Sequence, residues 1–305
     1  MRSIRLRHSG AALRHKKRRL AKAPFKAPLR LLGLMLAFFS GIGLMALGYW
    51  FYGGGRPMIL EVQTIEHTIE SHAQIEPFAC DRVKPVLYTG RMGLEELSVP
   101  ERKQRFIEMI LPAVLVAKHR QDVIRERVEG ILAKHYPSRS DSAYIERLLR
   151  HYRTTETEIL LSRLYTHPAS IALAQAALES GWGTSRLFQE AYNLFGVWSF
   201  NPREPRILAS GHRGGKPIYL RRYESPAHSI EDYFKTVGTS RSFEQFRNER
   251  LTSSDPFHLI SFLGLYSEQR ELYVNKLHRI VEANNLTRYD QCRLDPSYLK
   301  LKAAP

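Results

Sequence analysis

The sequence contains only two cysteines, Cys80 and Cys292, and no CxxC pair. This scarcity excludes a small disulfide-dense scaffold and a cysteine-built zinc site. The chain also lacks a Walker phosphate-binding motif and a helix with paired zinc-binding histidines, so we expect no cofactor and no metal. With 43% hydrophobic residues the chain is not disordered by composition, and it can bury a core in one large domain or two modest ones.

Acidic residues are absent from residues 1–30, although this segment holds eleven lysines and arginines. Most of the net charge of +16 therefore lies in one N-terminal segment. We predict that residues 1–30 are a basic cytoplasmic tail, attracted to anionic lipid. A nucleic-acid-binding arm is the alternative, but a basic run beside a membrane span is explained by topology, so we expect no nucleic-acid partner.

A long uncharged run occurs at residues 31–51, followed by Tyr52. At about 1.5 Å per residue this run can cross a bilayer core of about 30 Å. We predict a transmembrane signal anchor at residues 31–52, with aromatic residues at its far interface and the basic tail in the cytoplasm. The chain is then a single-pass protein of the inner membrane with a periplasmic C-terminal domain. A cleaved signal peptide is the alternative.

The exported part is expected to begin with a stalk and to end with a short tail. Residues 53–79 start with three glycines and show little sustained period, so we predict a flexible stalk there, with short extended pieces, and a C-terminal tail at residues 293–305. Cys80 and Cys292 lie near the two ends of the domain between them. In an oxidising compartment they are expected to form a disulfide, worth about 5 kcal/mol in loop-entropy models, with two unpaired buried thiols as the alternative.

Helical spacing of apolar residues dominates the domain, which indicates a mainly α fold. Residues 80–165 are predicted to form its helical N-terminal part, which begins with one long helix or with two helices broken at Pro112. Two further helices are expected at residues 140–153 and 155–166. The alanine-rich segment that follows Pro168 is apolar on all sides, which predicts a buried central helix.

That helix ends in the stretch "ALESGWGTS", where Glu179 stands beside Trp182. A carboxylate at a helix C-terminus faces the negative end of the helix dipole, and burial beside an indole removes water. Both effects raise the pKa of the carboxyl and favour its protonated form. A glycosidase needs such a glutamate as general acid, and lysozyme has one in a comparable apolar setting beside a tryptophan. A solvated surface acid is the alternative for Glu179.

Residues 171–198, "IALAQAALESGWGTSRLFQEAYNLFGVW", resemble the signature of the glucosaminidase domain of glycoside hydrolase family 73, in its Bax-type branch. Residues 219–234 and 264–286 resemble two later segments of the same family, in the same order. The resemblance covers roughly residues 100–290 and assigns the catalytic core to residues 166–292. It implies a mainly α, lysozyme-like domain with a small β-hairpin lobe, acting on the β-1,4-linked N-acetylglucosamine and N-acetylmuramic acid glycan of peptidoglycan.

The resemblance also implies roles for individual residues. Glu179 matches the general acid, and Tyr266 matches a tyrosine that lies beside the substrate and positions the reacting sugar or water. The turn that lines the cleft is matched by Asn193, Phe195 and Gly196. Tyr192 departs from the family, in which many members have an asparagine.

Two tryptophans, Trp182 and Trp198, are candidates for stacking on sugar rings, with a place in the core as the alternative for each. A second carboxylate opposite the acid is expected on the hairpin at residues 204–224. Glu204, where the chain enters the hairpin, is the first candidate, and Glu224 is the second. If neither serves, the N-acetyl group of the substrate or a water held by Tyr266 would have to replace it, so the stereochemistry stays open.

The function predicted from the sequence is therefore that of a peptidoglycan hydrolase, an endo-β-N-acetylglucosaminidase with Glu179 as general acid. Its expected partners are peptidoglycan glycan strands and the inner membrane, and the sequence sets no oligomeric state. A membrane-tethered protein that binds peptidoglycan without cleaving it is the alternative.

Overall fold

The computed structural model describes residues 58–213 and 216–303. The predicted basic tail and membrane span lie outside these residues. Within the described ranges, no helix combines the length and the apolar character that crossing a membrane requires.

The described chain is mainly helical, as the sequence predicts, with three two-stranded sheets. The helices are α2 (Val99–Leu132), α3 (Arg139–His151), α4 (Thr157–Leu164), α5 (Ala169–Ser180), α6 (Arg186–Ala191), α7 (Pro226–Thr239), α8 (Glu244–Glu249), α9 (Pro256–Ile260) and α10 (Glu271–Ala283). The strands are β1 (Met58–Val62), β2 (Ile65–Ile69), β3 (Val86–Gly90), β4 (Arg206–Arg213), β5 (Lys216–Arg221) and β6 (Leu299–Ala303).

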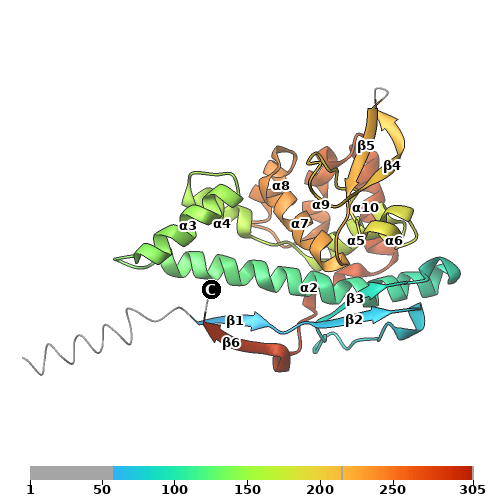
Figure 1. Cartoon of the computed structure of the whole chain (residues 1–305), viewed down its shortest axis with the longest axis horizontal. Helices are drawn as coiled ribbons and strands as arrows, with labels where there is room; N and C mark the ends of the chain where they lie inside the picture. Colours follow the sequence, from blue (N-terminus) through green and yellow to red (C-terminus); the bar gives the residue numbers. More distant parts are fainter. Residues whose placement is uncertain (1–57, 214–215, 304–305) are drawn as a thin grey trace, which may run out of the picture. The chain divides into compact units, whose positions relative to one another are not determined.

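Helix α2 runs the length of the domain between two layers (Figure 1). Strands β1, β2, β3 and β6 lie on one side of it, and α4, α5 and α7 lie on the other. The helix is continuous over 34 residues, so Pro112 does not break it. Proline removes one backbone hydrogen bond from a helix interior. Pro112 lies in a run of buried residues from Phe106 to Ala117, and packing on both sides holds the helix together at that point.

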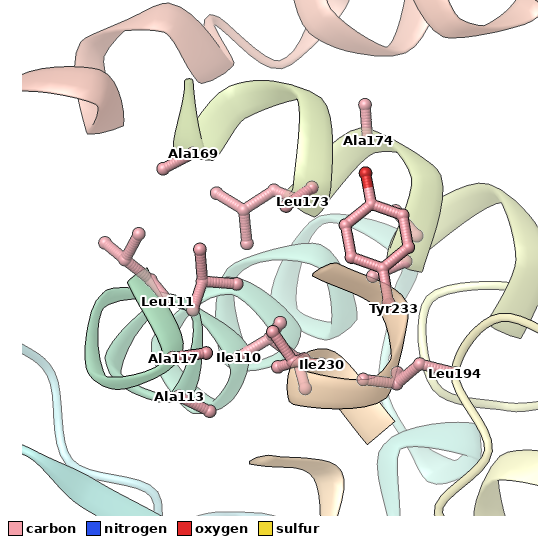
Figure 2. Packing of buried hydrophobic residues seen from close by; sticks show 14 of the residues in the cluster. Ile110, Leu111, Ala113, Ala117, Ala169, Leu173, Ala174, Leu194, Ile230 and Tyr233 are labelled. Atoms are coloured by element: carbon pink, nitrogen blue, oxygen red, sulfur yellow. The ribbon is translucent and has the colours of Figure 1, made fainter. Parts of the chain in front are cut away.

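The core is built around α5, which is buried on all sides as predicted. Its residues from Ala169 to Ala177 are all buried. Figure 2 shows α5 packed over α2 and α7, with Leu173 pointing toward α2 and the ring of Tyr233 reaching α5. Because alanine recurs along α5, neighbouring helices approach it closely and its polar residues become buried with it.

A smaller apolar cluster lies at the far end of α2, where α3 and α4 cover it. Its buried members are Val128, Ile131, Ile145, Leu148, Tyr152, Leu160 and Leu164. Ser138 begins α3 with a capping box, in which its hydroxyl accepts a hydrogen bond from the amide of Asp141. Both predicted helices of this region are therefore present.

The predicted stalk is a packed part of the domain from residue 58 onward, which corrects the expectation of a flexible segment. Strand β1 pairs antiparallel with β6, which lies in the predicted C-terminal tail, and β2 pairs in parallel with β3. Each of these strands is too short and too polar to bury an apolar face without a partner strand. Pairing between the two ends of the described chain supplies the missing partner, and periodicity alone gives no sign of it.

Cys80 and Cys292 form a disulfide, as predicted. Backbone pairing supports it on both sides, because the amide of Arg293 donates to the carbonyl of Cys80 and Val83 bridges to Leu294. The start and the end of the domain are thus fastened together at one place.

The β-hairpin lies where the sequence predicts it. Strands β4 and β5 pair antiparallel, with an irregularity in the register between Leu208 and His212. The hairpin projects from the helical layer beside α6 (Figure 1).

Candidate active site

The turn after α5 fixes the position of Glu179, the penultimate residue of that helix. Gly181, Trp182 and Gly183 all have positive φ, and the amide of Trp182 donates to the carbonyl of Ala177. A side chain at Gly183 would meet Leu94 at 2.8 Å, so only glycine fits there. The left-handed turn ends the helix abruptly and leaves Glu179 in its last turn.

The residue Glu179 is accessible to solvent, yet its carboxyl group is partly desolvated by the surrounding protein. Desolvation is the main cause of a raised pKa, which a hydrogen bond from Tyr273 and the charge of Lys276 partly offset. The raised pKa agrees in direction with the sequence prediction. The partners of the carboxyl are on α10, however, and no sequence pattern indicated them.

Trp182 packs into the edge of the core. Its ring lies edge-on to Phe106, with ring centres 5.6 Å apart, and the ammonium of Lys103 lies 5.2 Å from its centre. It is half-buried between α2 and the turn, so its larger role is to anchor the turn that follows Glu179.

A chain of hydrogen bonds leads from Glu179 into the core. Gln175, one helical turn before Glu179, donates from Nε2 to the hydroxyl of Tyr273 at 2.9 Å. The hydroxyl of Tyr233 donates to Oε1 of Gln175 at 2.5 Å and lies 2.9 Å from Nε2 of His167. Figure 2 shows the hydroxyl of Tyr233 pointing toward α5. The chain therefore runs from His167 through Tyr233, Gln175 and Tyr273 to the candidate acid.

The direction of this chain follows from the number of protons available. Tyr233 has one hydroxyl proton and donates it to Gln175, so Nε2 of His167 is assigned as the donor to Tyr233. His167 is then neutral, in agreement with a pKa that burial, Arg250 and Lys118 hold well below its usual value. Each group donates toward Glu179, an arrangement in which successive hydrogen bonds strengthen one another.

Tyr266 lies close to the acid, but its hydroxyl is engaged elsewhere. It ends the 3₁₀ helix η4 (Ser261–Tyr266), stacks on Tyr273 with ring centres 5.2 Å apart, and donates to the carbonyl of Phe195 at 2.9 Å. Burial raises its pKa well above the usual value. Tyr266 thus connects Tyr273, the partner of Glu179, to the turn at residues 193–196.

The turn at residues 193–196 is stabilised by buried side chains of residues that were expected to line the cleft. Asn193 is 1% exposed, and its amide group bonds the backbone of Val197 and the carbonyl of Arg221. Phe195 is also buried and stacks on Tyr233 at 4.2 Å. Gly196 is half-buried with φ of +66°. The side chains of Asn193 and Phe195 therefore shape this turn and do not face solvent.

The departure at Tyr192 also has a structural role. Its hydroxyl accepts a hydrogen bond from the amide of Gly90 at 2.7 Å, which ties the turn to β3. Tyr192 has φ of +50°, a conformation that asparagine adopts more readily than tyrosine. The strain is offset by a contact that the shorter asparagine side chain could not make.

An exposed aromatic pair lies at the base of the hairpin. Trp198 is 37% exposed and bridges to Leu220 of β5, and Phe200 is 83% exposed, with its ring centre 6.0 Å from that of Trp198. Sugar faces stack well on such rings. Sequence reasoning missed Phe200, although its spacing of two residues from Trp198 is the signal for a shared face of an extended segment.

Glu204 lies at the start of the hairpin and is paired with a cation. Its Oε1 is 3.4 Å from Nε of Arg221, which also bonds Asp232 at 2.7 Å. Glu224 is largely exposed and lies 4.0 Å from Nδ1 of His228. The two carboxyls of a glycosidase stand about 5–10 Å apart and do not bond each other, so the pairing of Glu179 with Glu204 or Glu224 stays a prediction.

Two further features bear on the chemistry. In the described part of the chain, no cluster of three or more His, Cys, Asp or Glu side chains is placed to hold a metal ion. A cavity of about 890 Å³ lies between the start of α2 and the chain after α10, and its lining includes Lys103 and Arg288 but not Glu179. The candidate site is therefore defined by the side chains around Glu179, which does not line this cavity.

Comparison with known proteins gives a family match at residues 156–286. This segment matches the family "Glucosaminidase: Mannosyl-glycoprotein endo-beta-N-acetylglucosaminidase". The chain is 26% identical to Protein bax of Escherichia coli strain K12 over 200 residues, which cover 60% of this chain and 70% of that protein. It is 28% identical to an autolysin of Enterococcus faecalis over 167 residues, which cover 50% of this chain and 21% of the autolysin.

Among solved structures, the catalytic domain of the autolysin Auto from Listeria monocytogenes is similar. It has 24% sequence identity and a TM-score of 0.36, with 54% of this chain and 96% of that domain covered.

Proposed function

Because this is a Bax-type protein with a glucosaminidase-family domain at residues 156–286, we propose that it is a peptidoglycan hydrolase. Its proposed reaction is cleavage of β-1,4-glycosidic bonds in the N-acetylglucosamine and N-acetylmuramic acid glycan, as an endo-β-N-acetylglucosaminidase. The finer proposal includes a lysozyme-like arrangement of the helical domain. The observation that carries the proposal is the partly desolvated carboxyl of Glu179, held by a hydrogen-bonded tyrosine at the end of a buried helix.

Glu179 is proposed to act as the general acid. Its raised pKa keeps a proton available, and the carboxyl is accessible enough to reach the leaving-group oxygen of a bound glycan. Tyr273 orients the carboxyl, and Gln175 holds Tyr273 in turn. The exposed rings of Trp198 and Phe200 are proposed to carry a sugar of the glycan strand.

Glu204 is kept as the proposed second carboxylate, on condition that the hairpin moves. Its contact with Arg221 holds it at the hairpin base, and a role as base or nucleophile requires that this contact break. Assistance by the N-acetyl group of the substrate is the alternative that needs no such movement.

The proposed setting is the periplasmic face of the inner membrane, with the chain anchored through residues 31–52. The support for this setting is the uncharged run and the basic residues before it. Glycan strands of peptidoglycan are the proposed substrate there.

The test is digestion of purified peptidoglycan by the full chain, with the new sugar ends identified by mass spectrometry. Glu179→Gln keeps the size of the side chain but removes its transferable proton, so turnover should fall by about a hundredfold or more. Glu190→Gln is the matched control, because Glu190 lies in the neighbouring α6, is exposed and pairs only with Arg186 in the described residues. Its turnover should match that of the parent.

Three outcomes decide between catalysis and binding alone. Loss of turnover in Glu179→Gln with an unchanged melting temperature supports the general acid. Near-parent turnover in a stable Glu179→Gln protein rules out this assignment. Binding to peptidoglycan by the parent chain without any new sugar ends identifies a non-catalytic wall anchor.

A further inference from the structure

The cavity of about 890 Å³ at the start of α2 has no role in the proposed reaction, although it is large enough to hold a short peptide. Three parts of the chain form its wall: residues 77–80, the first part of α2, and the end of α10 with the 3₁₀ helix η5 (Leu286–Gln291). Most of its lining residues lie outside the family match at residues 156–286. The cavity is therefore formed largely by segments that flank the family domain.

Two cations in the lining are available to a ligand. Lys103 is half-buried, and among the described residues its ammonium contacts only the ring of Trp182, at 5.2 Å, with no hydrogen bond or ion pair. Arg288 is exposed, its guanidinium lies 4.7 Å from the ring centre of Tyr289, and its Nη2 donates to the hydroxyl of that tyrosine. Arginine has five N–H donors, so most of those of Arg288 remain for a ligand.

Glu108 is the acid among the described lining residues, and its charge is already paired. It is 6% exposed, and its two oxygens accept from Nη1 of Arg105 at 2.9 Å and from Nε2 of Gln104 at 3.0 Å. The rest of the lining is partly apolar, with Pro77, Phe78, Val99, Pro100 and Ile107. The cavity therefore has an excess of positive charge beside apolar surface, and this combination suits a peptide that has carboxylates and small apolar side chains.

Two observations place the cavity close to Glu179. Lys103 lies over the ring of Trp182, which belongs to the turn directly after Glu179. On α10, Lys276, whose charge acts on Glu179, precedes Asn284 of the lining by eight residues, or about 12 Å of helix. An extended peptide of about four residues spans about 13 Å. A peptide branch on a sugar bound at Glu179 can therefore reach the cavity.

We propose that this cavity binds the stem peptide of peptidoglycan through the carboxylates of that peptide. The proposal rests on the proposed hydrolase function, and it specifies the substrate as a glycan that still carries its peptides. In such a glycan the lactyl carboxyl of N-acetylmuramic acid is bound to the peptide as an amide, so the free carboxylates belong to the peptide. Lys103 and Arg288 pair with these carboxylates, and the apolar lining packs on the methyl groups of its alanines.

The experiment is isothermal titration of the full chain in detergent with the free pentapeptide L-alanyl-γ-D-glutamyl-L-lysyl-D-alanyl-D-alanine, at constant ionic strength. Saturable binding of one peptide per chain is expected. Arg288→Gln and Lys103→Gln should each weaken binding by about five- to tenfold, because each removes one ion pair with a carboxylate. Arg279→Gln is the matched control, since Arg279 is an exposed arginine of α10 that does not line the cavity. It should bind the peptide as the parent does.

A second measurement separates a peptide site from a sugar site. KM is measured on glycan strands that carry stem peptides and on strands from which an amidase has removed them. In the parent, KM should be lower for the peptide-bearing strands, and Arg288→Gln should remove most of that difference. If Arg288→Gln raises KM equally on both kinds of strand, the cavity binds the sugar chain and the proposal is wrong.

Two results of the titration also overturn the proposal: no saturable binding of the peptide by the parent, or equal affinity in Arg288→Gln and Arg279→Gln. The eleven cations of residues 1–30 attract the acidic peptide in every variant, so only differences between variants report on the cavity. Binding of the free peptide requires no hydrolysis. Glu179→Gln should therefore bind it as the parent does, which separates this result from the fate of the proposed hydrolase function.

Discussion

Replacing Tyr273 by phenylalanine tests how the candidate acid is tuned. The change removes the hydroxyl that donates to Glu179 and that accepts a hydrogen bond from Gln175. The hydrogen bond favours the charged carboxylate and so lowers the pKa of Glu179; its loss should raise that pKa further. A general acid works only while protonated, so the alkaline limb of the activity profile should move to higher pH in Tyr273→Phe.

The size of the shift follows from the strength of one hydrogen bond. A hydrogen bond to a charged group contributes about 1.5–3 kcal/mol, and water that reaches the accessible Glu179 replaces part of it, leaving about 1 kcal/mol. One pKa unit corresponds to about 1.4 kcal/mol, so the alkaline limb should move up by roughly 0.5–1 pH unit. The amide of Gln175 loses its buried partner, which should also lower the free energy of unfolding by about 1–3 kcal/mol.

The assay is the pH dependence of kcat/KM on soluble glycan strands, with thermal melts of the same samples. Tyr266→Phe is the control, because it removes a hydroxyl from the ring stacked on Tyr273, but that hydroxyl bonds the carbonyl of Phe195. Its rate can fall, yet its alkaline limb should stay in place. An unmoved limb in Tyr273→Phe, or a shift to lower pH, refutes the hydrogen-bond account of the pKa.

Three other predictions concern stability and topology. Cys80→Ser should lower the free energy of unfolding by about 2–5 kcal/mol, because Cys80 and Cys292 close most of the domain into one loop; denaturant unfolding with parent-like stability would contradict this. Gly183→Ala should destabilise the domain by about 1–3 kcal/mol, since its methyl group would meet Leu94 at 2.8 Å and its φ is +81°; a melting temperature equal to the parent's would refute the strain. A reporter that fluoresces only in the cytoplasm should stay dark when fused after Pro305, and bright fluorescence would overturn the predicted topology.

Local features of the fold were predictable because each depends on neighbouring residues. The alanine-rich segment after Pro168 predicted α5, and Ser138 with Asp141 is a local capping signal for α3. The glycines around the hairpin predicted β4 and β5. The break at Pro112 could not be decided locally, because the packing of α2 between two layers keeps the helix continuous there.

The candidate site also combines features that the local sequence indicated with features that depend on contacts between distant segments. The motif around Glu179 indicated the acid, but its partner Tyr273 lies far along the chain and is brought close only by the packing of α10 against α5. Gln175 was a missed local signal, since it is polar in an apolar helix and lies one turn before Glu179. The side chain of Asn193, expected to line the cleft, is buried because its amide bonds the backbone across the turn.

By itself the sequence determined the mainly helical class, the central helix with Glu179 near its end, the hairpin and the two cysteines that could be joined, because these features depend on short-range pattern and composition. Tertiary structure alone decided that β1 pairs with β6, which turns an expected stalk and tail into one sheet. It also decided that His167, Tyr233, Gln175 and Tyr273 line up behind Glu179. Both outcomes depend on contacts between distant segments, which form only when the burial of one core brings those segments together.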